Sequence, residues 1–485
     1  MPIHLQTRNN VGNQTLKRMM TSAVKTMQGS DTLRAGGAAG VMIATRVFGA
    51  FGTLAYTVIL ARMLTPQEFG LVWTLWSGAF IAAYLSTLNI GATAIREVVR
   101  ARASGEDATA AGFVIVSRRV LLCAGLPVAA AFVTLIWVRN PAMTETYPLA
   151  ILLAATMIPV MGWNATNAAQ AVALDQVLRS QVPGMLLRPL VFCIVLGSAW
   201  IAGVSLSLES VVGLYLAIVI LIAFVQFALL RRFFDFMAIA TPDTSGWQRW
   251  IATGLLLAPN RLLTDRLRDV LLLIAAIPLG AVGVAQMAVA LSVVTFLSFA
   301  VNAVETSFAP KISRSISNVQ SEERAADKDP RTLHFIAMSG AIKICLMSAG
   351  ALVLWLFMPF VIGLFGADYA ASEKVIWWLF LVPLASAVFG NTALMMQLFD
   401  KRRVFFLTSV LGLGALLLVG FLTATSASNA LEITASGFAL TMVALQALRW
   451  ALCWITTGID VSALGALMRW QNHAPDQQGE QKVDV

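Results

Sequence analysis

Apolar residues in this chain fall into twelve blocks that are separated by short polar stretches. Each block is long enough to cross a hydrocarbon layer of about 30 Å as a helix. The chain shows no sustained alternation of apolar and polar positions, which is the pattern of a membrane barrel. The pattern therefore predicts spanning helices at 36–63, 69–94, 112–138, 146–172, 184–205, 209–231, 250–278, 281–307, 334–364, 373–398, 403–424 and 432–457.

The composition agrees with a membrane protein and excludes several other classes. Of 485 residues, 58% are hydrophobic and 12% charged, with a mean hydropathy of +0.77. A soluble domain of this size does not stay dissolved with such a composition. The four cysteines each lie inside an apolar block, and no His, Cys or carboxylate cluster has metal-ligand spacing. We expect no disulfide framework, no metal, no cofactor and no enzymatic activity.

The positive charges predict the orientation in the membrane. The net charge is +9, and basic residues gather before the first predicted helix and after the second, fourth, sixth, eighth and tenth. The opposite set of loops holds only Arg62, Arg139 and Lys374. This bias places both termini in the cytoplasm of a multi-pass protein of the bacterial inner membrane. A nucleic-acid groove would not alternate in this way, although some basic clusters could also contact anionic lipid head groups.

A weak internal repeat predicts two bundles. Shifting the chain by 213 residues superposes Gly70 on Gly283, Asn89 on Asn302 and Thr93 on Thr306. The expected fold is an all-α membrane protein of about twelve transmembrane helices in two six-helix bundles related by a pseudo-two-fold axis along the membrane normal. The expected parts are a cytoplasmic N-terminal segment (1–35), the N-terminal bundle (36–231), a cytoplasmic linker (232–249), the C-terminal bundle (250–457) and a cytoplasmic tail (458–485).

Ionisable residues concentrate in the predicted helix 250–278. On a continuous helix, Arg261, Asp265, Arg268 and Asp269 would share one face. Such groups cost about 2.5–3.5 kcal/mol each at the bilayer centre, so they persist mainly where they face a cavity or a partner. Together with Arg266 they leave a cationic surplus, which suits an anionic ligand. The alternative is a static ion network formed by Arg261, Asp265 and Arg268.

Among the ionisable residues of the other predicted spans are Arg46, Glu305, Lys343 and Arg449. Lys343, Arg449 and Glu305 are near cytoplasmic helix ends, so an alternative is that they extend to the interface. The sequence has no phosphate loop for nucleotide hydrolysis. We therefore treat Asp265, Asp269 and Glu305 as candidate carriers of a proton or sodium ion.

Several runs of the sequence resemble one family. They lie in order along residues 36–457 and comprise Leu60–Gly70 (LARMLTPQEFG), Leu187–Leu190 (LRPL), Arg268–Leu273 (RDVLLL), Gly280–Gly283 (GAVG), Ala309–Ile312 (APKI) and Leu364–Tyr369 (LFGADY). In these runs the chain resembles the Wzx-type polysaccharide flippases, within the multidrug/oligosaccharidyl-lipid/polysaccharide exporter (MOP) superfamily.

The resemblance implies a function and its partners. It implies a cationic cavity between two bundles that rock between inward-open and outward-open states, and substrates carried on undecaprenyl diphosphate. The expected function is a flippase for lipid-linked oligosaccharide, with Arg46, Arg261 and Arg268 binding the substrate. The phospholipid bilayer and a polysaccharide polymerase are the expected partners. The alternatives are a multidrug exporter of the same superfamily, which usually has an acidic or apolar pocket, and a membrane glycosyltransferase, which would carry a large outward loop.

Overall fold

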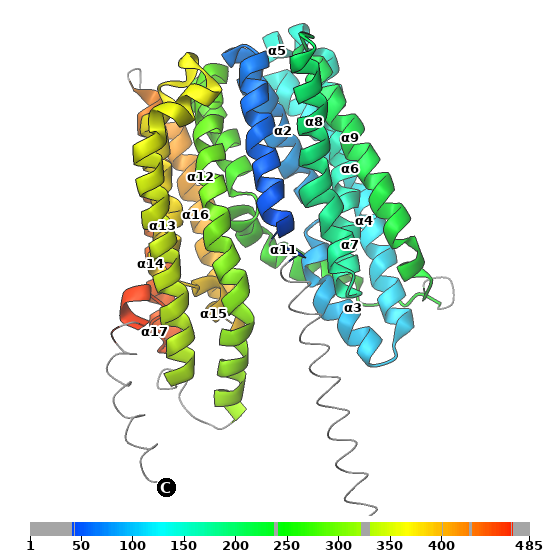
Figure 1. Cartoon of the computed structure of the whole chain (residues 1–485). Coiled ribbons are helices and arrows are strands. Elements are labelled where there is room, and N and C mark those ends of the chain that lie inside the picture. The colour runs from blue at the N-terminus through cyan, green and yellow to red at the C-terminus, as the bar shows by residue number, and fades with distance from the viewer. Residues whose placement is uncertain are drawn as a thin grey trace, which may run out of the picture.

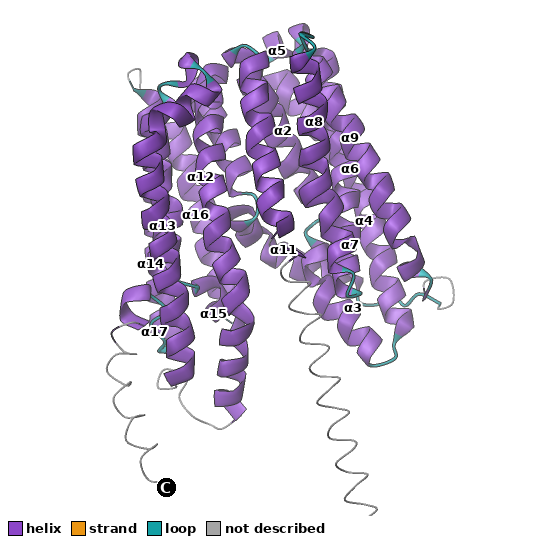
Figure 2. Ribbon diagram, viewed as in Figure 1, coloured by secondary structure: helices purple, strands orange, loops and turns teal. Residues whose placement is uncertain are grey.

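The computed structural model describes residues 41–42, 44–236, 241–321, 330–399, 401–425, 429–466 and 468. All regular secondary structure within these residues is helical (Figure 2). The predicted N-terminal segment 1–35, residues 237–240 of the predicted linker and residues 469–485 of the predicted tail lie outside the described residues.

Long helices make up most of the molecule, and short ones connect them. The long ones are Ala44–Met63, α2 (Pro66–Ser86), α4 (Asp107–Arg139), α6 (Pro148–Ala173), α8 (Arg188–Ile201), α9 (Leu208–Leu230), α11 (Trp247–Thr264), α12 (Leu267–Ser321), α13 (Pro330–Phe365), α14 (Ser372–Phe389), α16 (Arg402–Thr423) and α17 (Ala430–Thr457). The short ones are η1 (Ile90–Thr93), α3 (Ala94–Ala103), α5 (Pro141–Thr146), α7 (Val177–Val182), η2 (Pro183–Leu187), η3 (Arg231–Phe234), η4 (Ala367–Tyr369) and α15 (Thr392–Leu398).

The helices form two lobes (Figure 1). The N lobe contains the helices from Ala44 to α9, the C lobe contains α12 to α17, and α11 lies between them. The lobes are close together at the end that carries α5, here the distal end, and diverge toward the end that carries α3, here the proximal end. In the described part of the chain, eleven helices are long and apolar enough to span a membrane. The predicted class, an all-α multi-pass membrane protein of two helical bundles, is confirmed.

One of these eleven helices, α12, consists of two legs joined by a sharp turn at Gly280. The backbone there has φ 62° and ψ −174°, a conformation essentially restricted to glycine. The first leg of α12 continues the crossing that α11 begins, and the second leg returns toward the proximal end. The path therefore has the twelve crossings that the hydrophobic pattern predicts.

The predicted uninterrupted helix 250–278 is wrong. The helix stops at Thr264 and restarts at Leu267, so the seventh crossing is made of α11 and the first leg of α12. The break falls at Asp265 and Arg266, in the most charged part of any crossing. The two ion pairs here, Arg261 with Asp265 and Arg266 with Asp269, lie on opposite sides of the break.

The turn before α2 shows how local sequence starts a helix at the distal end. The Thr65 hydroxyl accepts a hydrogen bond from the Glu68 backbone N–H at 3.3 Å, and Glu68 Oε2 accepts one from the Thr65 backbone N–H at 3.1 Å. This capping box, followed by Pro66 at the first helical position, ends the preceding span and begins α2 within three residues.

The lobes meet where α2 packs against the second leg of α12. A Cβ on Gly70 would lie 1.8 Å from the backbone oxygen of Ala281, so only glycine permits this approach. Next to it, the rings of Phe69 and Tyr369 are edge to face with centroids 5.7 Å apart. The 213-residue shift superposes residues 66–86 on 279–299, so this contact joins the two copies of one repeated segment.

The first residues after α17 belong to the C lobe. Val461 and Ala463 are fully buried; the Val461 carbonyl lies against Gly390, and Ala463 packs on Gly340 of α13. This part of the predicted tail, residues 459–466, is therefore folded onto the proximal end of the C lobe, where Figure 1 shows it in red.

We predict that Gly280→Ala lowers the thermal midpoint of the detergent-solubilised protein, because a side chain at this φ and ψ costs about 1–3 kcal/mol. The matched control is Gly414→Ala in α16, where the added Cβ meets open space and the midpoint should stay or rise. Equal midpoints for the two variants would contradict the glycine-only turn.

Candidate functional site

The helix α11 bridges the two lobes at the centre of the molecule. Near its start, Arg249 Nη2 and Trp250 Nε1 donate to Glu97 Oε2 of α3 at 2.8 and 3.2 Å. One turn further, Asn89 Nδ2 donates to the Gly254 carbonyl at 3.1 Å. Near its end, Leu263 packs against Gly412 of α16 in the C lobe. Side chains of α11 therefore have neighbours in both lobes.

Arg261 and Asp265 form one ion pair on this bridge. Their Nη1 and Oδ2 atoms are 2.8 Å apart, and both side chains are about half exposed. The Tyr84 hydroxyl of α2 donates to the Ala258 carbonyl at 3.4 Å, and it is close enough to feel the charges of both residues. The pair is thus next to the N lobe and accessible.

Beyond the break, three charged residues occupy the start of α12. Arg266 Nη1 lies 3.5 Å from Asp269 Oδ2, and Asp269 is nearly buried. The Arg268 guanidinium lies over the ring of Trp73, 4.0 Å from its centroid, and Nη2 donates to Ser292 Oγ at 2.8 Å. No ion pair of Arg268 occurs within the described residues. Of the predicted row, Arg261 and Asp265 are paired on one helix face, and the break separates Arg268 from them.

Arg188 is a cluster member that the sequence analysis did not select. It follows the π-helical turn η2, whose Met185 carbonyl packs closely on Gly49 of the first span. Its charge acts on both the Tyr56 hydroxyl and the Asp269 carboxylate. The sequence feature that points to Arg188 is its position as an arginine inside the apolar block 184–205. In the sequence analysis this arginine appears only within a family motif. π-helical turns are frequent at functional sites.

These residues together define what we name the central cluster: Arg188, Arg261, Asp265, Arg266, Arg268 and Asp269. Four guanidiniums face two carboxylates, so the cluster has a surplus of two positive charges. Positive charges inside membrane-spanning segments are costly unless an anion or water compensates them. The arrangement is therefore suited to an anionic group.

Arg46 lies apart from the central cluster, on the proximal part of the first span. Its Nη1 donates to Thr306 Oγ1 of the second leg of α12 at 3.3 Å, so it contacts the other lobe. Of the three predicted substrate-binding arginines, the structure brings Arg261 and Arg268 into one cluster and places Arg46 nearer the proximal end.

Glu305 belongs to a second polar group within the C lobe. Lys343 Nζ donates to Glu305 Oε1 at 2.9 Å and to Asn391 Oδ1 at 2.6 Å. Lys343 is 1% exposed and Arg449, which donates to Ser409 Oγ at 2.8 Å, is 3% exposed. The alternative that these two cations extend to the membrane interface is wrong, because both are enclosed by the protein.

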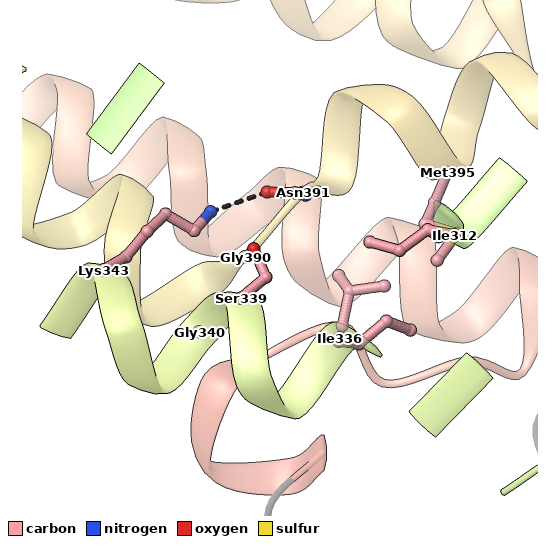
Figure 3. Close-up of a pocket in the computed structure, with 9 residues that line it drawn as sticks. Ile312, Ile336, Ser339, Gly340, Lys343, Gly390, Asn391 and Met395 are labelled. Carbon is pink, nitrogen blue, oxygen red and sulfur yellow. Dashed lines mark hydrogen bonds between the residues drawn. The ribbon is translucent and has the colours of Figure 1, made fainter. Parts of the chain in front are cut away.

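A small cavity adjoins Lys343 on its proximal side (Figure 3). Its volume is about 10 Å³, close to the minimum for one water molecule. The buried Ser339 hydroxyl on the cavity wall has no hydrogen-bond partner in the described part of the chain, and Val461 also lines the cavity. In the described ranges, no group of three or more His, Cys, Asp or Glu side chains is placed to bind a metal.

Comparison with known proteins identifies the fold. No family model and no curated protein matches this chain. It resembles the inward-facing conformation of a multidrug resistance MATE family transporter of the MOP superfamily, with 12% identity and a TM-score of 0.62 over 84% of this chain and 94% of that one. It resembles an outward-facing conformation of such a transporter with 12% identity and a TM-score of 0.58, covering 86% and 95%.

A third similar structure is a MOP superfamily transporter from Pyrococcus furiosus Vc1, at 14% identity and a TM-score of 0.62, covering 87% of this chain and 95% of that one. Its binding pocket is described as having reverse polarity, which suggests a different function for that protein. At these identities the likeness shows the fold alone. The chain has the two-lobe fold of MOP superfamily transporters, which agrees with the predicted superfamily.

We predict that Glu305→Gln destabilises the protein more than Lys343→Met does. Removing the carboxylate leaves a buried ammonium uncompensated, at a cost of about 3–5 kcal/mol. Removing the ammonium leaves Glu305, whose side chain is 34% exposed and can be hydrated. The thermal midpoints of the two variants measure these losses of stability, and the double variant should recover part of the stability that Glu305→Gln loses. Strictly additive losses would show that the pair is not coupled.

Proposed function

We propose that this protein is a flippase that moves undecaprenyl-diphosphate-linked oligosaccharide across the bacterial inner membrane for surface or exopolysaccharide biosynthesis. The observation that carries the proposal is the positive surplus of the central cluster, between two lobes of a transporter fold. Guanidinium donates two parallel hydrogen bonds to phosphate oxygens and stays charged at physiological pH. The Pyrococcus furiosus transporter, whose reverse pocket polarity suggests a different function for that protein, supports the use of this fold for more than one function.

In this proposal the substrate enters from the proximal side. The positive-inside bias makes this side cytoplasmic: α3 carries Arg96, Arg100 and Arg102, whereas Arg62 and Arg139 are distal. Arg46 meets the anionic head group on entry, and Arg261 and Arg268 then hold the diphosphate. The lipid tail remains among the acyl chains. The N-terminal and C-terminal bundles move as the two units of alternating access, with both termini in the cytoplasm.

Ion coupling is assigned to the carboxylates near these cations. Asp265 is about half exposed and paired with Arg261, so a substrate phosphate competes with it for the same guanidinium. Asp269 and Glu305 are the other candidates. Binding a proton or sodium ion at any of them removes negative charge near an anionic substrate. The phospholipid bilayer and a polysaccharide polymerase remain the proposed partners.

We predict that Arg261→Ala combined with Arg268→Ala reduces polymer export at least tenfold at normal protein level, since a hydrogen bond to a charged group contributes about 1.5–3 kcal/mol. Lys replacements, which keep charge but lose the fork, should retain part of the activity. The control is Arg119→Ala, an exposed arginine of α4. Normal export by the double Ala variant would remove the assigned role.

The competing function, multidrug export, predicts the opposite selectivity. In proteoliposomes, a flippase translocates a fluorescent lipid-linked oligosaccharide and the Arg261 and Arg268 variants lose that activity. An exporter of cationic drugs instead moves a cationic dye, and losing positive charge from the cluster would preserve or increase dye transport.

We predict that Arg188→Gln lowers flipping, but by less than Arg268→Ala does, because Arg188 is the weaker electrostatic neighbour of the Asp269 carboxylate. The measurement is initial flipping rate against substrate concentration, in which loss of binding appears as a raised half-saturation concentration. A rate curve identical to that of the parent would exclude Arg188 from the substrate site.

A further inference from the structure

The three basic residues at the distal end are exceptions to the charge pattern of the chain, and the structure distinguishes them. Lys374 is exposed and pairs with Glu432 at 3.3 Å within the C lobe. Arg139 is exposed at the end of α4. Arg62, at the distal end of the first span, reaches across to the other lobe. Basic residues are disfavoured on the distal side, so the contact of Arg62 with the other lobe calls for an explanation of its own.

Arg62 bonds the last turn of α13. Its Nε donates to the Leu364 carbonyl at 2.8 Å, and its Nη2 donates to the Gly363 carbonyl. These carbonyls are among the four at a helix C-terminus that have no partner inside the helix. Gly366, at φ 126°, ends α13, and its N–H already bonds Ile362. The N lobe therefore supplies the C-terminal cap of a C-lobe helix.

The geometry favours arginine at this position. Two donors of one planar fork meet two successive carbonyls at the negative end of the helix dipole. A lysine has the same charge but cannot hold both carbonyls from one rigid plane. The two hydrogen bonds of Arg62 thus hold the lobes together and also fix their relative orientation.

Apolar contacts surround this bond and also cross between the lobes. Phe69 and Tyr369 are buried against each other, and Gly70 touches Ala281 through the backbone. We name this set, with Arg62, the distal clasp. Because Arg62 itself is exposed, water can hydrate the guanidinium and both carbonyls once they separate. The polar part of the clasp is therefore reversible.

The proximal end lacks an equivalent clasp among the described residues. Below the clasp the first span reaches the C lobe through the rings of Phe51 and Phe296, whose centroids are 4.8 Å apart, and through the Arg46 to Thr306 bond of 3.3 Å. Neither contact caps a helix end of the other lobe. Opening at the distal end requires Arg62 to release α13.

We propose that Arg62 is a conformational latch: it caps α13 across the lobe boundary, holds the distal end closed, and releases when that end opens. This inference rests on the proposed function, since a latch between lobes acts in alternating access. It assigns a role to an arginine that is outside the substrate site.

The test measures lobe separation without substrate. The four native cysteines, which form no disulfide, are replaced, and spin labels are placed at Glu145→Cys of α5 and Glu373→Cys of α14, which are exposed distal sites in different lobes. Distance distributions are measured by pulsed electron paramagnetic resonance in nanodiscs. Arg62→Gln should raise the ratio of long to short distances about tenfold, because two charge-assisted hydrogen bonds are lost. Arg62→Lys should raise it less.

The matched control is Arg139→Gln, which removes the same charge from the same end and should leave the distribution unchanged. An unchanged distribution in Arg62→Gln overturns the latch, and so does an equal shift in Arg139→Gln, which would make the effect one of surface charge. If Arg62→Gln opens the distal end while the Arg261 and Arg268 variants export polymer normally, the latch stands and only the proposed substrate assignment fails.

Discussion

The architecture depends on a backbone contact between the lobes, in which Gly70 lies directly against Ala281. A side chain on Gly70 would overlap the Ala281 carbonyl, so this glycine sets how closely the two lobes approach at the distal end. The lobes diverge from there toward the proximal end, as Figure 1 shows. The charged residues of α11 and α12 therefore lie between two lobes whose separation depends on this close contact.

The sequence predicted the spans well because hydrophobic length is a strong constraint in a membrane. It failed where partners from distant segments decided the outcome. Just after the break, Arg268 lies over the ring of Trp73 from another helix, and helical periodicity carries no information about such a partner. Residues 459–466 looked like a polar tail, yet their small side chains fit beside Gly340 and Gly390.

Part of the central cluster could be predicted, and part could not. Arg261, Asp265, Arg268 and Asp269 were visible because ionised groups in an apolar block are costly and therefore informative. Arg188 obeys the same rule, but a single cation near the end of a block also fits an interfacial residue. Its role depends on its proximity to Asp269, which is a property of the folded chain.

The two copies of the internal repeat differ at the position of the break. The 213-residue shift superposes the break at 265–266 on Gly52 and Thr53, within the unbroken span Ala44–Met63. Gly52 packs there against Pro189 and Leu190, so the N-lobe copy keeps a straight, closely packed helix. The C-lobe copy lacks this straight, closely packed helix, and the charged residues of α11 are next to the N lobe. The two copies of the repeat therefore differ in structure. One copy provides a straight, closely packed helix. The other provides a broken, cationic segment that contacts both lobes and must change shape when they move.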